Sequence, residues 1–266
     1  MPKFGTLPDT FEPDKVPRQV VAVGGELVSG GMEVDFHRHR KAQLLFTVRG
    51  IVRCEASKGL WIVPPQCAIW IPGNMRHSVK VVGPLEAYCL FVEPGATPAL
   101  PQTCCTVSVS PMLRELILRC AALPALYPLE GPESRLAMVL LDELAAAPVE
   151  LLHLPMPADK RLRKIAERLT ANPSDRGTMQ EWASSIGVGE RTLGRLLLQH
   201  TGMSFGRWRQ QIQIMLALQW LSQGAAVQTV ALDLGYESAG SFVTMFRKAM
   251  GTAPARYMAQ RLAGPS

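Results

Sequence analysis

The chain has 266 residues, of which 47% are hydrophobic, and a formal net charge of +6. This length suffices for one large hydrophobic core or two modest ones, and we expect two domains. No run approaches the roughly 18 uninterrupted apolar residues that a membrane-spanning helix needs, so we expect a soluble protein without a membrane partner. The six cysteines form no C-x-x-C pair and no apolar N-terminal run suggests export, which favours reduced thiols in the cytoplasm.

The basic charge is concentrated in the C-terminal part of the chain. Residues 157–266 carry 14 Lys and Arg against 7 Asp and Glu, whereas residues 1–156 carry 14 against 15. A polyanionic partner is therefore expected for the C-terminal part, although an ordinary solvated basic face would give the same charge balance.

Residues 18–93 consist of short β-rich runs separated by Gly, Pro and Asn. This alternation of short apolar runs and turn residues is typical of an antiparallel sandwich or barrel, so a small all-β domain is expected there. Residues 112–126 and 133–147 follow, with apolar residues three and four apart, and predict a helical hairpin. Its apolar face is covered either by a second copy of the chain, which we prefer, or by the β domain. Two prolines within residues 153–159 predict a linker.

The segment after this linker has the spacing of a helix-turn-helix motif. Thr178 and Glu181 form a capping-box pattern at the start of a short helix. A small residue at Ala183 allows two helices to approach closely, and Gly187 supplies the turn between them. Leu193 fills the space where these two helices cross. The helix that follows the turn therefore presents its outer face to solvent or to DNA.

The same pattern returns further along the chain. Ala231 precedes Gly235 by four residues, Phe242 follows it by seven, and Ser238 can cap a second exposed helix. One such match could arise by chance, whereas two in tandem indicate paired DNA-binding motifs. Residues 205–224, between the two, have the pattern of one continuous helix. Roughly 18 residues span about 27 Å, of the order of the ~34 Å between successive major grooves.

Residues 160–262 resemble the DNA-binding domain of the AraC/XylS family of transcriptional regulators. The stretch "TGMSFGRWRQQ" is similar to the start of the family's linker helix, and "ALDLGYESAGSFVTMFRKAMGTAPARYM" follows its second-motif signature. The matching residues of that signature are Ala231, Gly235, Tyr236, Ser238, Phe242, Phe246, Gly251, Pro254 and Tyr257.

The resemblance implies that each recognition helix enters one of two successive major grooves. Arg191, Gly194 and Arg195 match the base-reading positions of the first helix, whereas the matching positions of the second are small or apolar. Because such side chains contact thymine methyl groups but offer few hydrogen bonds, the first motif is expected to dominate specificity. The candidate DNA-binding residues are Glu190, Arg191, Thr192, Gly194, Arg195, Ser238, Ala239, Gly240, Ser241, Val243, Thr244 and Arg247.

The aromatic and basic residues of the C-terminal part can also be explained without contact to DNA. Five aromatic residues sit at helical spacings that favour core packing over base stacking. They are Trp182, Trp208, Trp220, Phe242 and Phe246. A basic run on the first helix of the domain is either solvated or in contact with phosphate. It comprises Lys160, Arg161, Arg163 and Lys164.

The N-terminal half carries a second resemblance. Alternate residues of a strand share one face, which places His37, His39, Lys41 and Gln43 together. The run that contains them, from Gly31 to Gly50, resembles the first motif of the cupin barrel. The stretch "QCAIWIPGNMRHSV" resembles the second motif, with Pro72, Gly73 and His77 in place and one extra residue before the histidine.

The cupin resemblance implies a metal site of three His and one Glu, and Gln43 replaces that carboxylate here. Without an anion the affinity for zinc, iron or nickel should fall, and Lys41 on the same face should disfavour a cation further. We therefore expect a metal-free effector pocket of His37, His39, Gln43 and His77. A metal held by His37, His39 and His77 is one alternative, and a hydrogen-bonded scaffold is another.

Together these features predict an α+β protein with three parts. Residues 1–105 form a cupin-like effector-binding β-barrel domain, 106–155 a helical hairpin and linker that dimerises the chain, and 156–266 an AraC-type DNA-binding domain with two helix-turn-helix motifs joined by a long helix. The expected function is a cytoplasmic, homodimeric transcriptional regulator that binds operator DNA and a small-molecule effector, with no catalytic residues and no cofactor. The alternative is a cupin-type metal-dependent enzyme, a dioxygenase or isomerase, fused to a DNA-binding tail.

Overall fold

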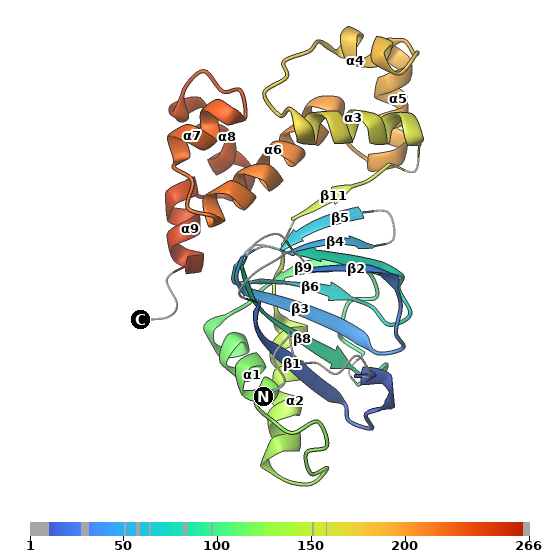
Figure 1. Cartoon of the computed structure of the whole chain (residues 1–266), viewed down its shortest axis with the longest axis vertical. Coiled ribbons are helices and arrows are strands. Elements are labelled where there is room, and N and C mark those ends of the chain that lie inside the picture. Colours follow the sequence, from blue (N-terminus) through green and yellow to red (C-terminus); the bar gives the residue numbers. More distant parts are fainter. Residues whose placement is uncertain are drawn as a thin grey trace. The chain divides into compact units, whose positions relative to one another are not determined.

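The computed structural model describes residues 11–27, 32–50, 52–56, 59–63, 65–81, 84–96, 98–150, 152–157 and 159–262. The chain divides into two compact units, with the division near His153 and Leu154. The N-terminal unit contains two β-sheets and two helices, and the C-terminal unit is helical (Figure 1). Within the described ranges, no helix is both long and apolar enough to cross a membrane.

The described strands of the chain form two sheets. Their bounds are β1 Val20–Leu27, β2 Met32–His37, β3 Ala42–Arg49, β4 Val52–Ala56, β5 Gly59–Val63, β6 Cys67–Ile71, β7 His77–Val81, β8 Leu85–Val92, β9 Cys105–Ser108, β10 Val149–Glu150 and β11 His153–Pro155. One sheet has the order β1-β8-β3-β6-β9-β10 and the other the order β11-β5-β4-β7-β2. This arrangement confirms the predicted all-β domain as two antiparallel sheets, which the described strands do not close into one barrel.

The six-stranded sheet is covered on both faces. The first six residues of β3 are all buried, which a sheet with one solvated face does not permit. One set of alternating side chains, including Leu44 and Phe46, joins a core with Ile117 and Leu140 of the helices. The other set, which includes Gln43, faces the five-stranded sheet, because Gln43 bonds to His77 of β7.

The predicted helical hairpin is present as α1 (Pro111–Ala121) and α2 (Pro132–Ala146). Ser110 caps α1 by accepting a hydrogen bond from the backbone N–H of Leu113. Helix α1 packs against β1 and β8 (Figure 1), so the inner apolar face of the hairpin is buried on the β domain. From the sequence, either a second copy of the chain or the β domain could cover this face. In the structure the β domain covers it. The predicted linker at residues 153–159 begins with strand β11.

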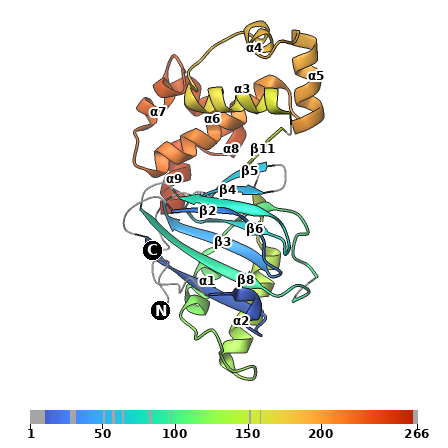
Figure 2. The ribbon, with the colours of Figure 1, turned by 45° about the vertical axis from the view of Figure 1, so that its right-hand side comes forward.

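The C-terminal unit contains seven helices in its described part. They are α3 Lys160–Ala171, α4 Met179–Ser185, α5 Glu190–Thr201, α6 Phe205–Ser222, α7 Val227–Asp233, α8 Ala239–Met250 and α9 Pro254–Leu262. Helices α4 and α5 form the first helix-turn-helix motif and α7 and α8 the second, and α6, with 18 residues, connects them (Figure 2). The pattern of two tandem motifs and a long linking helix is confirmed.

Local signals explain why these helices begin and end where they do. Thr178 and Glu181 form the predicted capping box at the start of α4. Gly187 and Gly235, in the turns of the two motifs, have φ of 71° and 83°, a left-handed conformation that favours glycine. Ser238 caps α8 by accepting a hydrogen bond from Ser241.

Candidate DNA-binding helices and histidine site

The first recognition helix, α5, turns its polar residues outward. Ala183 and Leu193 are buried between α4 and α5, as their spacing predicts. Glu190, Arg191 and Arg195 are exposed on α5. Thr192 and Gly194 are half-buried on the same helix. This face therefore offers two guanidinium groups that can donate to base edges or phosphates.

The second recognition helix, α8, presents a different chemistry. Among the predicted residues, Ser238, Gly240, Ser241, Thr244 and Arg247 are exposed, and Ala239 and Val243 are half-buried. The Thr244 hydroxyl donates to the backbone oxygen of Gly240 at 2.9 Å, which leaves its methyl group for apolar contact. Arg247, in the last turn, is the one basic residue among these positions.

The aromatic residues of the unit are mainly core residues, as predicted. Trp182, Trp208, Phe242 and Phe246 are buried, whereas Trp220 is half-buried. Within the basic run on α3, two arginines are held by neighbouring groups. The Arg161 guanidinium pairs with the Asp159 carboxylate at 2.7 Å, and Arg163 donates to the backbone oxygen of Pro157 at 3.0 Å. Lys160 and Lys164 are exposed, so the run offers fewer unengaged charges than its sequence suggests.

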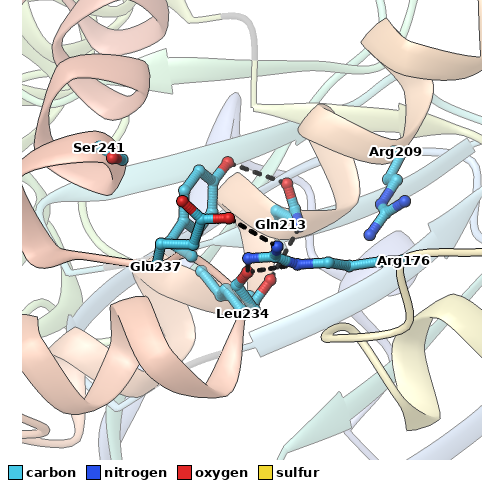
Figure 3. Close-up of a pocket in the computed structure, with 8 residues that line it drawn as sticks. Arg176, Arg209, Gln213, Leu234, Glu237 and Ser241 are labelled. Atoms are coloured by element: carbon cyan, nitrogen blue, oxygen red, sulfur yellow. Dashed lines mark hydrogen bonds and ion pairs between the residues drawn. The ribbon is translucent and has the colours of Figure 1, made fainter.

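A polar cluster connects the loop before α4 to the turn of the second motif (Figure 3). Arg176 donates from Nε to the backbone oxygen of Gly235 at 3.0 Å and pairs with Glu237 at 3.0 Å. Gln213, on α6, donates to the backbone oxygen of Leu234 at 3.1 Å and accepts from the Tyr236 hydroxyl at 3.0 Å. Sequence reasoning missed Arg176 and Gln213, because their partners lie far away in the sequence.

The four predicted residues of the effector pocket come together between the two sheets. His37 and His77 are paired across β2 and β7, and their ring centroids are 4.3 Å apart. Gln43 reaches them from β3, with Oε1 2.9 Å from Nε2 of His77 and 3.0 Å from Nε2 of His39. The Gln43 amide nitrogen lies 3.3 Å from the sulfur of Cys89, a neighbour that the sequence analysis did not identify.

The backbone around this site differs from the predicted single strand. Residues 38–41 form a connection between β2 and β3, which belong to different sheets. The extra residue before His77 is absorbed in a tight turn, where Asn74 has φ of 62° and donates to the backbone oxygen of His39 at 2.8 Å. A Cβ at Gly73 would lie 2.2 Å from the backbone oxygen of Arg40, so this close approach requires glycine.

Lys41 does not face the histidines, and the expectation that it does was wrong. Its ammonium group is fully buried and donates to the backbone oxygens of Val16 and Arg18 at 2.7 Å each. The Glu93 carboxylate lies 3.6 Å away and supplies the opposite charge. The strand alternation that predicted a shared face is broken in residues 38–41, so Lys41 turns towards the N-terminal segment.

Burial controls ionisation at the histidine site. His77 is buried, and desolvation lowers the pKa of its imidazole to about 4. Desolvation also raises the pKa of the Cys89 thiol to about 12. At neutral pH the described core of the site therefore contains a neutral imidazole, a neutral amide and a neutral thiol.

Comparisons with known proteins agree with both halves of this description. Residues 30–184 match the family model of the AraC-like ligand binding domain, and residues 182–260 match that of a helix-turn-helix domain. The HTH-type transcriptional regulator NimR of Escherichia coli strain K12 is 41% identical over 250 residues, which cover 94% of this chain and 91% of that protein. RipA, an HTH-type transcriptional regulator of Corynebacterium glutamicum, is 33% identical over 103 residues, or 39% of this chain and 31% of its own.

Among solved structures, ToxT of Vibrio cholerae aligns with 93% of this chain and 97% of its own, with a TM-score of 0.40 and 10% identity. The family-model matches and the relationship to NimR over nearly the whole of both chains establish the family. The protein belongs to the AraC family of transcriptional regulators, with a ligand-binding N-terminal domain and a helix-turn-helix DNA-binding domain.

Proposed function

We propose that this regulator acts in the cytoplasm as a homodimer, and that α5 and α8 of each chain enter successive major grooves of an operator. The observation that carries the proposal is the pair of motifs on the 18-residue helix α6. At about 1.5 Å per residue this helix is about 27 Å long, comparable with the ~34 Å repeat of B-DNA. A homodimer is supported by apolar side chains that α1 and α2 leave exposed.

Base readout is assigned mainly to α5. Arg191 and Arg195 are exposed, and a guanidinium can donate two hydrogen bonds to the O6 and N7 atoms of guanine. The small and apolar positions of α8, such as Ala239 and Val243, suit contact with thymine methyl groups. We therefore assign most of the sequence preference to α5, and to α8 a contribution from shape complementarity.

The N-terminal unit is assigned the role of a sensor and not of an enzyme, because the matching family model describes a ligand-binding domain of regulators. Its effector site is the cluster of His37, His39, Gln43 and His77, where polar groups from both sheets converge. A ligand bound there changes operator affinity only to the extent that it distinguishes DNA-competent from incompetent conformations, typically by about 1–3 kcal/mol.

The test of the DNA-binding assignment is Arg195→Ala in the full chain, with Arg256→Ala, an exposed arginine on α9, as the matched control. If Arg195 reads a base edge, its loss should weaken operator binding by about 1–3 kcal/mol and binding to random duplex DNA by less. Affinities are measured by fluorescence anisotropy at several salt concentrations, on DNA from upstream of the protein's own gene. Equal losses on both DNAs would assign Arg195 to phosphate contact, and a flat salt response of the wild type would contradict DNA binding itself.

A further inference from the structure

The outward face of α5 carries a leucine beside its two arginines. The buried residues of α5 lie on one side of the helix, and the opposite side faces solvent. At about 3.6 residues per turn, Leu198 is displaced by only ~20° around the helix axis from Arg191, seven residues earlier. Leu198 is 60% exposed, and Arg195 is exposed on the same side of the helix. These three side chains therefore share the face that the proposed function directs at DNA.

One exposed leucine on a protein surface is ordinary, but the place of Leu198 on α5 is informative. Counted from Arg191, the residues of this face stand at offsets of three, four and seven, which are Gly194, Arg195 and Leu198. The recognition helix of a homeodomain contacts bases in the major groove from positions with the same offsets. Leu198 therefore occupies the fourth position of a face that suits contact with base edges.

The charges around Leu198 favour a polyanion over a protein as the partner of this face. Among the residues that the structure describes, no carboxylate pairs with the guanidinium of Arg191 or of Arg195. Both guanidinium groups are thus available to phosphates or to guanine edges. A protein that covered Leu198 would have to supply acidic groups to both arginines, whereas DNA carries acceptors for them along its whole length.

The major groove offers one kind of apolar group to a leucine. Base edges there present hydrogen-bond donors and acceptors, except for the C5 methyl group of thymine. Contact of a leucine with any other base edge would desolvate a polar group without replacing its hydrogen bond. Gly194 has no side chain, which lets a base approach the helix between Arg191 and Leu198. A thymine methyl group is therefore the favourable contact for this side chain.

We propose that Leu198 contacts the methyl group of a thymine in the part of the operator that α5 binds, and so adds a thymine preference to the base contacts of Arg191 and Arg195. The proposal rests on the proposed entry of α5 into a major groove. Leu198 lies about 4.5 Å beyond Arg195 along the helix axis, and successive base pairs are about 3.4 Å apart. The thymine should thus lie one or two base pairs from the base that Arg195 contacts.

The test measures by fluorescence anisotropy how tightly the full-length chain binds operator duplexes in which deoxyuridine replaces one thymine at a time. Deoxyuridine lacks only the C5 methyl group. At one position near the base that Arg195 contacts, this replacement should weaken binding by the wild type about 3- to 5-fold, as expected for one methyl group removed from an apolar contact. Leu198→Ala should weaken binding to the unmodified operator and should show no further loss at that position.

Two variants serve as matched controls. Leu198→Met keeps an apolar side chain and should retain most of the deoxyuridine effect. Leu232→Ala removes another exposed leucine, 56% exposed on α7 and outside the recognition helices, and should retain all of it. Circular dichroism checks that each variant is folded, which is expected because both leucines are exposed.

Deoxyuridine effects of equal size in the wild type and in Leu198→Ala at every position would overturn the proposal. Unchanged operator affinity of Leu198→Ala would also overturn it and would assign Leu198 to contact with another protein. Arg195→Ala separates this failure from a failure of the proposed function. If Arg195→Ala still lowers operator affinity more than affinity for random DNA, α5 contacts bases and only the role of Leu198 fails.

Discussion

Asp159 is the N-cap of α3 and contacts both the backbone and the guanidinium of Arg161. Its carboxylate pairs with the guanidinium at 2.7 Å and accepts a hydrogen bond from the backbone N–H at 2.8 Å. The guanidinium beside it lowers the pKa of Asp159 to about 2, from an ordinary value of 3.8. Because the folded-state pKa is depressed, the stabilisation is complete above pH 3.8 and is lost as the pH falls towards 2.

We expect Asp159→Ala to lower the free energy of unfolding by about 1 kcal/mol at pH 7, the usual loss for an N-cap. The difference from the wild type should shrink between about pH 4 and pH 2, as protonation removes the same contacts in the wild type. Asp159→Asn is the control, because asparagine caps helices equally well but does not ionise. Urea unfolding followed by circular dichroism at 222 nm measures both, and a gap that stays constant down to pH 2 would contradict the argument.

At the scale of elements, Arg176 joins the loop that precedes the first motif to the turn of the second motif. Figure 3 shows the Arg176 side chain directed at the backbone of this turn and at Glu237. A Cβ at Gly235 would lie 2.9 Å from the Cα of Ser174, so the loop and the turn approach closely. The Arg176–Glu237 pair is exposed and contributes little by itself. The hydrogen bonds to the Gly235 carbonyl are the stronger part of the contact.

Arg176→Ala should weaken binding to a full operator by about 2- to 10-fold, because a contact of about 0.5–1.5 kcal/mol no longer fixes the spacing of α5 and α8. Binding to DNA that contains only the α5 half-site should not change. Glu237→Gln, the control, removes the exposed ion pair and should have little effect on either DNA. If Arg176 instead contacts phosphate, half-site affinity would fall as well and the salt slope would decrease by about 1.

At the scale of the whole molecule, the helical hairpin buries one apolar face on the β domain and leaves further apolar side chains exposed among the described residues. The inner face packs on the six-stranded sheet. Five large hydrophobic side chains on α1, α2 and their connection remain exposed among the described residues, namely Met112, Leu126, Leu129, Met138 and Val139. Exposed apolar surface of this kind favours association. The homodimer stays a prediction, and these exposed side chains are its candidate contacts in place of the buried face that the sequence suggested.

Sedimentation equilibrium should show that the wild type is a dimer at micromolar concentration and that Met138→Lys shifts it towards monomer. A charge in the centre of an apolar contact must be desolvated, which disfavours association. Leu232→Lys is the matched control, because Leu232 is an exposed apolar residue of α7 in the other unit. A monomeric wild type, or the same shift in both variants, would show that this face is not the interface.

Several features of this protein were determined by the sequence alone, because their signals are local. The capping box at Thr178, the serine cap at Ser238 and the turn glycines Gly187 and Gly235 specify where helices begin and end through neighbouring residues. These signals were sufficient to predict the paired motifs and the family.

Other features were decided only by the tertiary structure, because they depend on residues far apart in the chain. Lys41 turns to Val16 and Glu93 instead of the histidines, since residues 38–41 leave the strand. The inner face of the hairpin meets the six-stranded sheet, and Arg176 meets the Gly235 carbonyl. Alternation and spacing describe one element at a time, whereas these contacts follow from how elements pack, which no local pattern encodes.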